Sequence, residues 1–143
     1  GDPRPRETMA ARATDAGFAF ATVIHPRVER SRWVEIGEGT VIFAGTVLTT
    51  NIVLGRHVQI NPGCTVAHDV VMGDFASLAP GVRISGHVRL GRRAYLGTGA
   101  TVINGRLGEP LEIGDDAVIG AAACVTKSVP AGATAVGVPA RTR

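Results

Sequence analysis

The chain has 143 residues, of which 45% are hydrophobic and 19% charged, a composition typical of one globular domain with a sizeable core. No apolar run approaches the ~20 residues that cross a bilayer, and the opening GDPRPRE lacks a signal peptide's apolar segment, so we expect a cytoplasmic protein without membrane insertion. The net charge is +3 without an aromatic-plus-basic cluster, which favours phosphorylated small molecules over nucleic acid as partners.

The N-terminal segment differs from the rest of the chain. Residues 5–17, PRETMAARATDAG, predict a short helix with proline near its start and glycine after its end. The stretch FAFATVI, residues 18–24, predicts an apolar strand. We therefore divide the chain into residues 1–23 and 24–143. The first part either caps the open end of the second or is the remainder of a larger N-terminal domain.

A six-residue repeat dominates the second part, from about residue 24 to 129. Twelve consecutive positions, spaced six residues apart, hold a large aliphatic residue. These positions are Ile36, Ile42, Leu48, Leu54, Ile60, Val66, Met72, Leu78, Ile84, Leu90, Leu96 and Val102. A helix has a period of 3.6 residues and a strand a period of two, so period six fits neither. It predicts short strands separated by sharp turns, each placing one aliphatic side chain inside a narrow prism.

The repeat is interrupted once, and it contains a glycine column. Its phase breaks across INGRLGEPLE, residues 103–112, and resumes at Ile113, which predicts a loop that projects from one corner of the prism. If residues 18 apart stack, Gly37, Gly55, Gly73 and Gly91 form one column, as a shared corner conformation would require.

The two cysteines, Cys64 and Cys124, have no CxxC spacing, so they indicate neither a zinc site nor a disulfide. We interpret them as buried free thiols.

Three further motifs carry a family resemblance: VIHP at 23–26, INPGCTVAHDVVMGDFASLAPGVRISG at 60–86, and GVPAR at 137–141. With the repeat, they resemble the hexapeptide-repeat acyltransferases. The branch they resemble contains bacterial N-acetyltransferases of nucleotide-linked amino sugars and sialic acid O-acetyltransferases.

The resemblance implies an all-β fold, a left-handed parallel β-helix with three hexapeptides per coil and a short N-terminal α/β segment. Residues 1–23 then resemble the end of a nucleotide-binding α/β domain. The resemblance also implies acetyl-CoA as acyl donor, a sugar substrate, and a homotrimer with active sites at the subunit interfaces.

The HD pair, His68 and Asp69, is the catalytic candidate. The resemblance makes His68 the general base, and imidazole, with an ordinary pKa of about 6.5, suits proton removal at neutral pH. Asp69 can fix the imidazole tautomer or bind the substrate amine, although many relatives carry Glu at this position. Composition alone offers a plainer alternative, because His and Asp are ordinary turn residues.

The 18-residue register and the resemblance add further candidates. Gly86 lies one coil above His68, where its N–H can stabilise an oxyanion, and His87 lies above Asp69, to which it can donate a hydrogen bond. Asn61 matches a family position for substrate binding but can also support a turn. The resemblance assigns acetyl-CoA binding to Gly97, Gly120, Ala121, Lys127, Pro139 and Arg141.

The leading function is an acetyl-CoA-dependent N-acetyltransferase on a nucleotide-linked 4-amino sugar. An O-acetyltransferase on a sugar or sialic acid hydroxyl, and a purely structural β-helix subunit, stay open. A metal enzyme of the γ-carbonic anhydrase type needs histidines at ligand spacing. The histidines at 25, 57, 68 and 87 lie 32, 11 and 19 residues apart, so we expect no metal, and we interpret His25 and His57 as structural or exposed.

Overall fold

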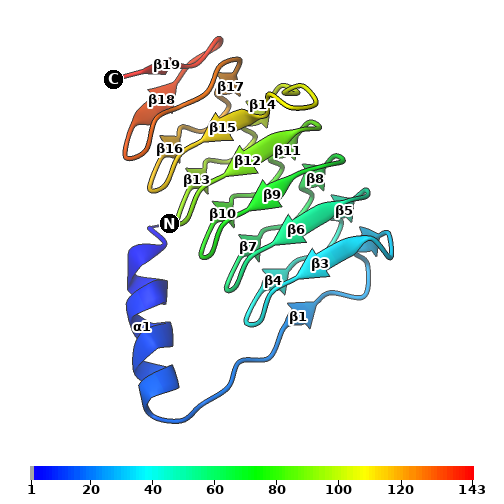
Figure 1. The fold of residues 1–143 in the computed structure, drawn as a ribbon, viewed down its shortest axis with the longest axis vertical. Helices are drawn as coiled ribbons and strands as arrows, with labels where there is room; N and C mark the ends of the chain where they lie inside the picture. Colours follow the sequence, from blue (N-terminus) through cyan, green and yellow to red (C-terminus); the bar gives the residue numbers. More distant parts are fainter. Residues whose placement is uncertain (1) are drawn as a thin grey trace.

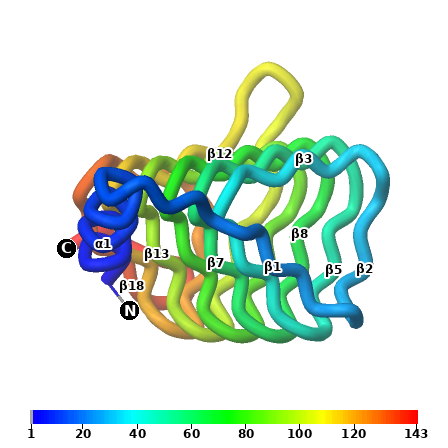
Figure 2. The backbone as a smooth tube through the Cα atoms, turned by 90° about the horizontal axis from the view of Figure 1, so that it is seen from below, coloured from blue at the N-terminus to red at the C-terminus, as the bar shows by residue number. Residues whose placement is uncertain are grey.

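The computed structural model describes residues 2–143, and it confirms the predicted left-handed parallel β-helix of hexapeptide repeats. The chain winds in three-sided coils, and the stacked sides form three sheets (Figures 1 and 2). Sheet A contains β1 (Val23–Ile24), β4 (Val41–Ile42), β7 (Gln59–Ile60), β10 (Ser77–Leu78), β13 (Tyr95–Leu96), β16 (Val118–Ile119), β18 (Thr134–Val136) and β19 (Arg141–Thr142). Sheet B contains β2 (Glu29–Arg30), β5 (Val47–Leu48), β8 (Thr65–Val66), β11 (Arg83–Ile84), β14 (Thr101–Val102) and β17 (Cys124–Val125). Sheet C contains β3 (Val34–Ile36), β6 (Ile52–Leu54), β9 (Val71–Met72), β12 (Val88–Leu90) and β15 (Leu111–Ile113).

Neighbouring coils stack in the predicted register of 18 residues. Ser77 pairs in parallel with Tyr95, for example, and the only antiparallel pair of named strands in residues 2–143 joins β18 to β19. After β14 the separation in sequence between paired residues increases from 18 to 23, so that Arg89 pairs with Glu112. The added residues form the predicted loop between β14 and β15, which projects from the stack in Figure 2.

The core is a column of aliphatic side chains inside the prism. Eleven of the twelve repeat positions are buried, and Ile36 in the first coil is half-buried. Side chains alternate between the inside and the outside of the prism along each strand. In β6, Ile52 and Leu54 point inward and are buried, while Val53 points outward and is 40% exposed. Each large buried side chain contributes about 1.5–3 kcal/mol relative to an exposed one, so the stack stabilises itself coil by coil.

The glycine column forms, but for a different reason from the one predicted. None of Gly37, Gly55, Gly73 and Gly91 has a positive φ. A Cβ at Gly37 would instead lie 2.4 Å from the carbonyl oxygen of Gly55, and one at Gly73 would lie 2.7 Å from the backbone nitrogen of Arg92. These positions need glycine because the backbones of adjacent coils approach too closely for any side chain.

Helix α1, Arg4–Asp15, agrees with the predicted helix to within two residues at its C-terminal end. It lies along the side of the prism rather than across its open end (Figures 1 and 2). Only β1 of the predicted strand at 18–24 forms, because residues 18–22 have no strand beside them, and Phe18 is 68% exposed.

Whether residues 1–23 derive from a larger domain stays a prediction. Among residues 2–143, no helix is both long and apolar enough to pass through a bilayer.

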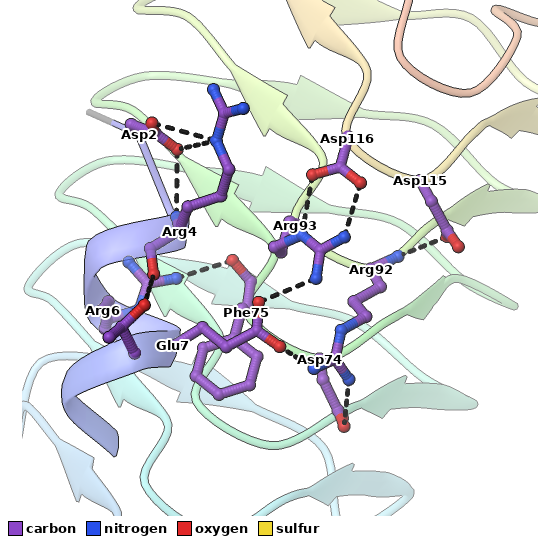
Figure 3. Close-up of polar contacts among 11 residues, drawn as sticks. Asp2, Arg4, Arg6, Glu7, Asp74, Phe75, Arg92, Arg93, Asp115 and Asp116 are labelled. Atoms are coloured by element: carbon purple, nitrogen blue, oxygen red, sulfur yellow. Dashed lines mark hydrogen bonds and ion pairs between the residues drawn. The ribbon is translucent and has the colours of Figure 1, made fainter. Parts of the chain in front are cut away.

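Two arginines of the prism hold α1 by its Glu7 (Figure 3). Glu7 pairs with Arg92, and its second carboxylate oxygen accepts a 2.8 Å hydrogen bond from Arg93. Arg93 also makes two hydrogen bonds to Asp116, at 2.6 and 2.7 Å. This bidentate pair holds the pKa of the Asp116 carboxyl below its ordinary value and fixes the guanidinium for Glu7.

A second set of charges runs along the corner where the chain passes from sheet C to sheet A. Glu38, Arg56, Asp74, Arg92 and Asp115 occupy successive coils, so the sign of the charge alternates. Arg56 reaches Glu38 at 3.2 Å, and its backbone N–H donates to Asp74 at 2.7 Å. The backbone N–H of Arg92 donates to Asp115 at 2.7 Å. The contacts of this charge ladder join adjacent coils along that corner.

Arg6 makes the most buried polar contact of α1. Its guanidinium donates to Gln59 Oε1 at 2.9 Å, the Phe75 carbonyl at 2.6 Å and Ser77 Oγ at 2.9 Å. We therefore expect Arg6→Ala to increase hydrogen exchange of the α1 amides at least ~10-fold, because three hydrogen bonds of about 1 kcal/mol each are lost.

The matched control is Arg12→Ala, at an exposed position of the same helix. Hydrogen exchange of the strand amides in the prism is expected to stay unchanged in both variants. Equal protection of α1 in both variants would show that Arg6 does not anchor the helix.

The cysteine prediction is half right. Cys64 is buried and its thiol contacts the Ala79 carbonyl at 3.2 Å, and burial raises its pKa. Cys124 is a free thiol but only half-buried, because it points outward from β17.

Candidate active site

His68 and Asp69 lie at the corner where the chain passes from sheet B to sheet C, which we call the B–C corner. They connect β8 to β9, and the inward residues Val66 and Val70 on either side are buried. Their own side chains point outward and are 52% and 39% exposed. The fold therefore presents both polar groups on the surface of a rigid prism.

The two side chains form a hydrogen-bonded pair. His68 Nδ1 lies 2.7 Å from Asp69 Oδ2, and this hydrogen bond is the largest of the effects that lower the pKa of Asp69. An ionised carboxylate only accepts hydrogen bonds, so Nδ1 of His68 must carry the proton. In the neutral imidazole Nε2 then keeps a free lone pair, which is the form that a general base requires.

Asp69 belongs to a column of corner residues with left-handed backbone. Asn51, Asp69 and His87 have φ values of 52°, 58° and 55°, and Asn, Asp and His are the residue types that tolerate this conformation best. Asn51 Nδ2 donates to Asp69 Oδ1 at 3.4 Å. Asn51 is not among the residues predicted from the sequence, although a step of 18 residues back from Asp69 locates it.

His87 lies above Asp69 as predicted, but the expected hydrogen bond does not form. His87 Nδ1 is 3.8 Å from Asp69 Oδ2, beyond hydrogen-bond distance. The rings of His68 and His87 meet edge to face with centroids 5.1 Å apart. The sequence spacing showed no close histidine pair, whereas the coiled chain brings these two together.

Gly86 lies directly against the imidazole of His68. A Cβ at this position would be 2.5 Å from His68 Cε1, so any other residue would displace the ring. Within residues 2–143, no protein acceptor takes a hydrogen bond from the Gly86 N–H. An N–H without a protein acceptor is free to donate a hydrogen bond to a ligand.

A groove of about 530 Å³ lies beside this pair on the outer face of sheet B. Its lining includes Thr65, His68, Arg83, Gly86 and Asn104. The volume lies within the range of ordinary ligand sites. Asn104 is the second residue of the loop between β14 and β15, so this loop borders the groove.

Two of the predicted acetyl-CoA residues, Lys127 and Arg141, lie close together near the C-terminal end of the prism. The strand register places His68, Gly86, Asn104 and Lys127 one above another on the B–C corner. Lys127 and Arg141 share a hollow of about 210 Å³ near the C-terminal end. Stacked strands are about 4.8 Å apart, so Lys127 lies roughly 14 Å along the corner from His68.

Four predicted acetyl-CoA residues remain, and two of them, Gly97 and Gly120, have a packing role. A Cβ at Gly97 would lie 2.6 Å from the backbone nitrogen of Ala121, and one at Gly120 would lie 2.8 Å from Val136 Cγ1. Ala121 and Pro139 are exposed, and the peptide bond before Pro139 is cis. Whether these four residues contact acetyl-CoA stays a prediction.

The remaining candidates lie away from His68. Asn61 lies at the corner between sheets A and B, where its amide donates to the Leu78 carbonyl at 2.7 Å, so its role in substrate binding stays a prediction. His57 is buried, stacked on Phe75 at 4.8 Å, and burial lowers its pKa. Nδ1 of His25 accepts the backbone N–H of Arg27 at 3.1 Å. His57 is therefore packed into the structure, whereas His25 is half-buried.

Comparisons with known proteins identify the family. The family described as bacterial transferase hexapeptide (six repeats) matches residues 51–86, which include His68, Asp69 and Gly86. WeeI from Acinetobacter baumannii is 40% identical, with a TM-score of 0.87 over 99% of this chain and 67% of that chain. The chain belongs to the hexapeptide-repeat acetyltransferases.

Two other solved structures of this family carry informative ligands. Perosamine N-acetyltransferase from Caulobacter crescentus, a histidine-to-asparagine mutant in complex with CoA and GDP-perosamine, is 35% identical, with a TM-score of 0.94. The match covers 99% of this chain but 65% of that chain, so this chain spans about two thirds of the relative's length. The acetyltransferase domain of PglB from Neisseria gonorrhoeae, in complex with acetyl coenzyme A, is 32% identical, with a TM-score of 0.91 over 99% and 67% of the two chains. No curated protein matches the chain in sequence.

Proposed function

We propose that the chain is an acetyl-CoA-dependent N-acetyltransferase that acts on a nucleotide-linked 4-amino sugar. One observation carries the proposal: the His68–Asp69 pair lies beside the unpaired N–H of Gly86 at the edge of a ligand-sized groove. A base and an oxyanion donor in contact are the two groups that acyl transfer to an amine requires.

The amino nitrogen attacks the thioester carbonyl carbon while His68 Nε2 removes the proton of the amine. Asp69 stabilises the resulting imidazolium through its 2.7 Å hydrogen bond to Nδ1. The Gly86 N–H donates to the oxyanion of the tetrahedral intermediate. The carbon–sulfur bond then breaks, the imidazolium returns its proton to the sulfur, and the products are an amide and free CoA.

The donor is proposed to lie along the B–C corner. Lys127 and Arg141 supply positive charge for its phosphates, and the corner leads from them past Asn104 to Gly86. The relatives support both substrates, since one structure holds CoA with GDP-perosamine and another holds acetyl coenzyme A. His87 and Asn51 border the acceptor's reacting end.

We also propose a cytoplasmic homotrimer with active sites at its interfaces. The outward valines of sheet C, Val53 and Val71, are 40% and 41% exposed and adjoin the B–C corner. Packing against a second copy would bury them and close the groove beside His68. Sedimentation velocity measures the assembly directly, and a monomer with full activity would contradict it.

The test is release of free thiol from acetyl-CoA in the presence of a panel of acceptors. The panel contains nucleotide-linked 4-amino sugars, free sialic acids and simple sugars. We expect turnover with an amino sugar, an amide product by mass spectrometry, and at least ~100-fold lower kcat/KM for the matched 4-hydroxy sugars.

Calorimetric binding of acetyl-CoA is measured in parallel, so that donor binding and acceptor binding are separated. Turnover with sialic acids alone would favour the O-acetyltransferase. Absence of both donor binding and turnover would leave only the structural β-helix subunit and would overturn the proposal.

A further inference from the structure

Two imidazoles and one carboxylate converge at the B–C corner. Nδ1 of His68 and Nδ1 of His87 face the same oxygen, Asp69 Oδ2, at 2.7 and 3.8 Å. One ligand atom from each of the three side chains lies within 4.8 Å of the others. We propose that these three residues form a binding site for a single Zn²⁺ ion, which blocks the catalytic base when it binds.

The geometry matches zinc in spacing and in chemistry. Zinc bonds to imidazole nitrogen and carboxylate oxygen are about 2.0–2.2 Å long, so two ligand atoms of a tetrahedral ion lie roughly 3.3 Å apart. The observed 2.7 and 3.8 Å bracket this separation, and small side-chain rotations equalise them. Two imidazoles with one carboxylate suit zinc and not the hard cations Mg²⁺ and Ca²⁺, which prefer oxygen ligands.

The site is accessible and rigidly supported. The side chains of His68, Asp69 and His87 are 52%, 39% and 25% exposed, so an ion can reach them from solvent. They come from two successive coils, joined here by the hydrogen bond from the His87 N–H to the His68 carbonyl at 3.1 Å. Three protein ligands leave a fourth position for water.

Binding has a direct consequence for the base. The ion replaces the proton on Nδ1 of His68, and in the neutral ring that proton moves to Nε2, where the lone pair had been. Nε2 can then no longer accept a proton from the amine. This consequence rests on the proposed function, whereas the metal site itself does not.

The experiment uses the whole chain after dialysis against a chelator. Isothermal calorimetry with ZnCl₂ is expected to give one ion per chain, with a rise in the thermal midpoint, because the ion joins two coils. Co²⁺ is expected to give the visible absorption of a four-coordinate ion. Removing a ligand in His87→Gln or Asp69→Asn is expected to weaken zinc binding at least ~10-fold.

The matched control is His25→Gln, which removes a histidine from a different corner and is expected to bind zinc as the unsubstituted chain does. Absence of binding, or equal binding in all variants, overturns the site. Inhibition of acetyl transfer that a chelator reverses supports it further. Zinc binding without inhibition supports the metal site and counts against His68 as the base, so the two proposals fail separately.

Discussion

Replacing His68 by alanine is expected to lower kcat for acetyl transfer by about 10³-fold, the range that a general base contributes. The effect should appear in kcat more than in the KM for acetyl-CoA, because Lys127 and Arg141 lie several coils away. The prism should remain intact, since the side chain of His68 is 52% exposed and adds nothing to the core. Initial rates measure kcat and KM, and circular dichroism measures whether the prism is intact.

The control for this variant is His25→Ala, because His25 lies at a different corner and its side chain accepts a hydrogen bond from the backbone N–H of Arg27. Its rate should stay within about twofold of the unsubstituted chain. Turnover by His68→Ala within tenfold of that rate, in a folded protein, would remove His68 from the mechanism. Asn51 and His87 would then be the next polar groups on the same corner to examine.

The stacking register of the coils was predictable from the sequence because every strand needs one aliphatic side chain that points into the core. An inward aliphatic residue every six positions fixes the core, and the 18-residue step places Gly86 and His87 above His68 and Asp69. The same step locates Asn51 below Asp69, and it locates Lys127 only after the loop's extra residues are counted. The repeat therefore determines which of these site residues lie on adjacent coils.

The position of α1 was not predictable in this way. Its contacts join Arg6 and Glu7 to residues 53 to 86 positions later, and no periodic signal links them. The charge ladder was equally hidden, because alternating charges at 18-residue spacing resemble ordinary surface composition. Long-range polar contacts of this kind depend on geometry that only the folded chain supplies.

Asp69 shows why sequence alone left its role open. A left-handed corner with φ of 58° favours Asp for purely conformational reasons, as it favours Asn at position 51. The turn explanation is therefore correct for the backbone of Asp69. It does not account for His68, which lies before the left-handed residue and is not needed to make the turn. The 2.7 Å hydrogen bond adds a second role to Asp69.

Gly73→Ala is expected to destabilise the prism strongly. Its Cβ would lie 2.7 Å from the backbone nitrogen of Arg92 and 2.8 Å from the carbonyl carbon of Gly91. Backbone cannot rotate away as a side chain can, so the two coils must separate and the core between them loosens. We expect the free energy of unfolding to fall by about 3 kcal/mol, the upper end of the usual overpacking cost.

Gly81→Ala is the matched control. Gly81 has a φ of +71°, but a Cβ there meets nothing within 4 Å, so alanine costs only its left-handed backbone, about 1–2 kcal/mol. Urea unfolding of both variants at one protein concentration measures the difference. Each coil of a stack is stabilised mainly by its contacts with the two adjacent coils. A lower dependence of the unfolding free energy on urea (m-value) in Gly73→Ala would therefore show that the stack unfolds in two parts. Equal losses in the two variants would mean that close backbone approach is not what keeps glycine in the column.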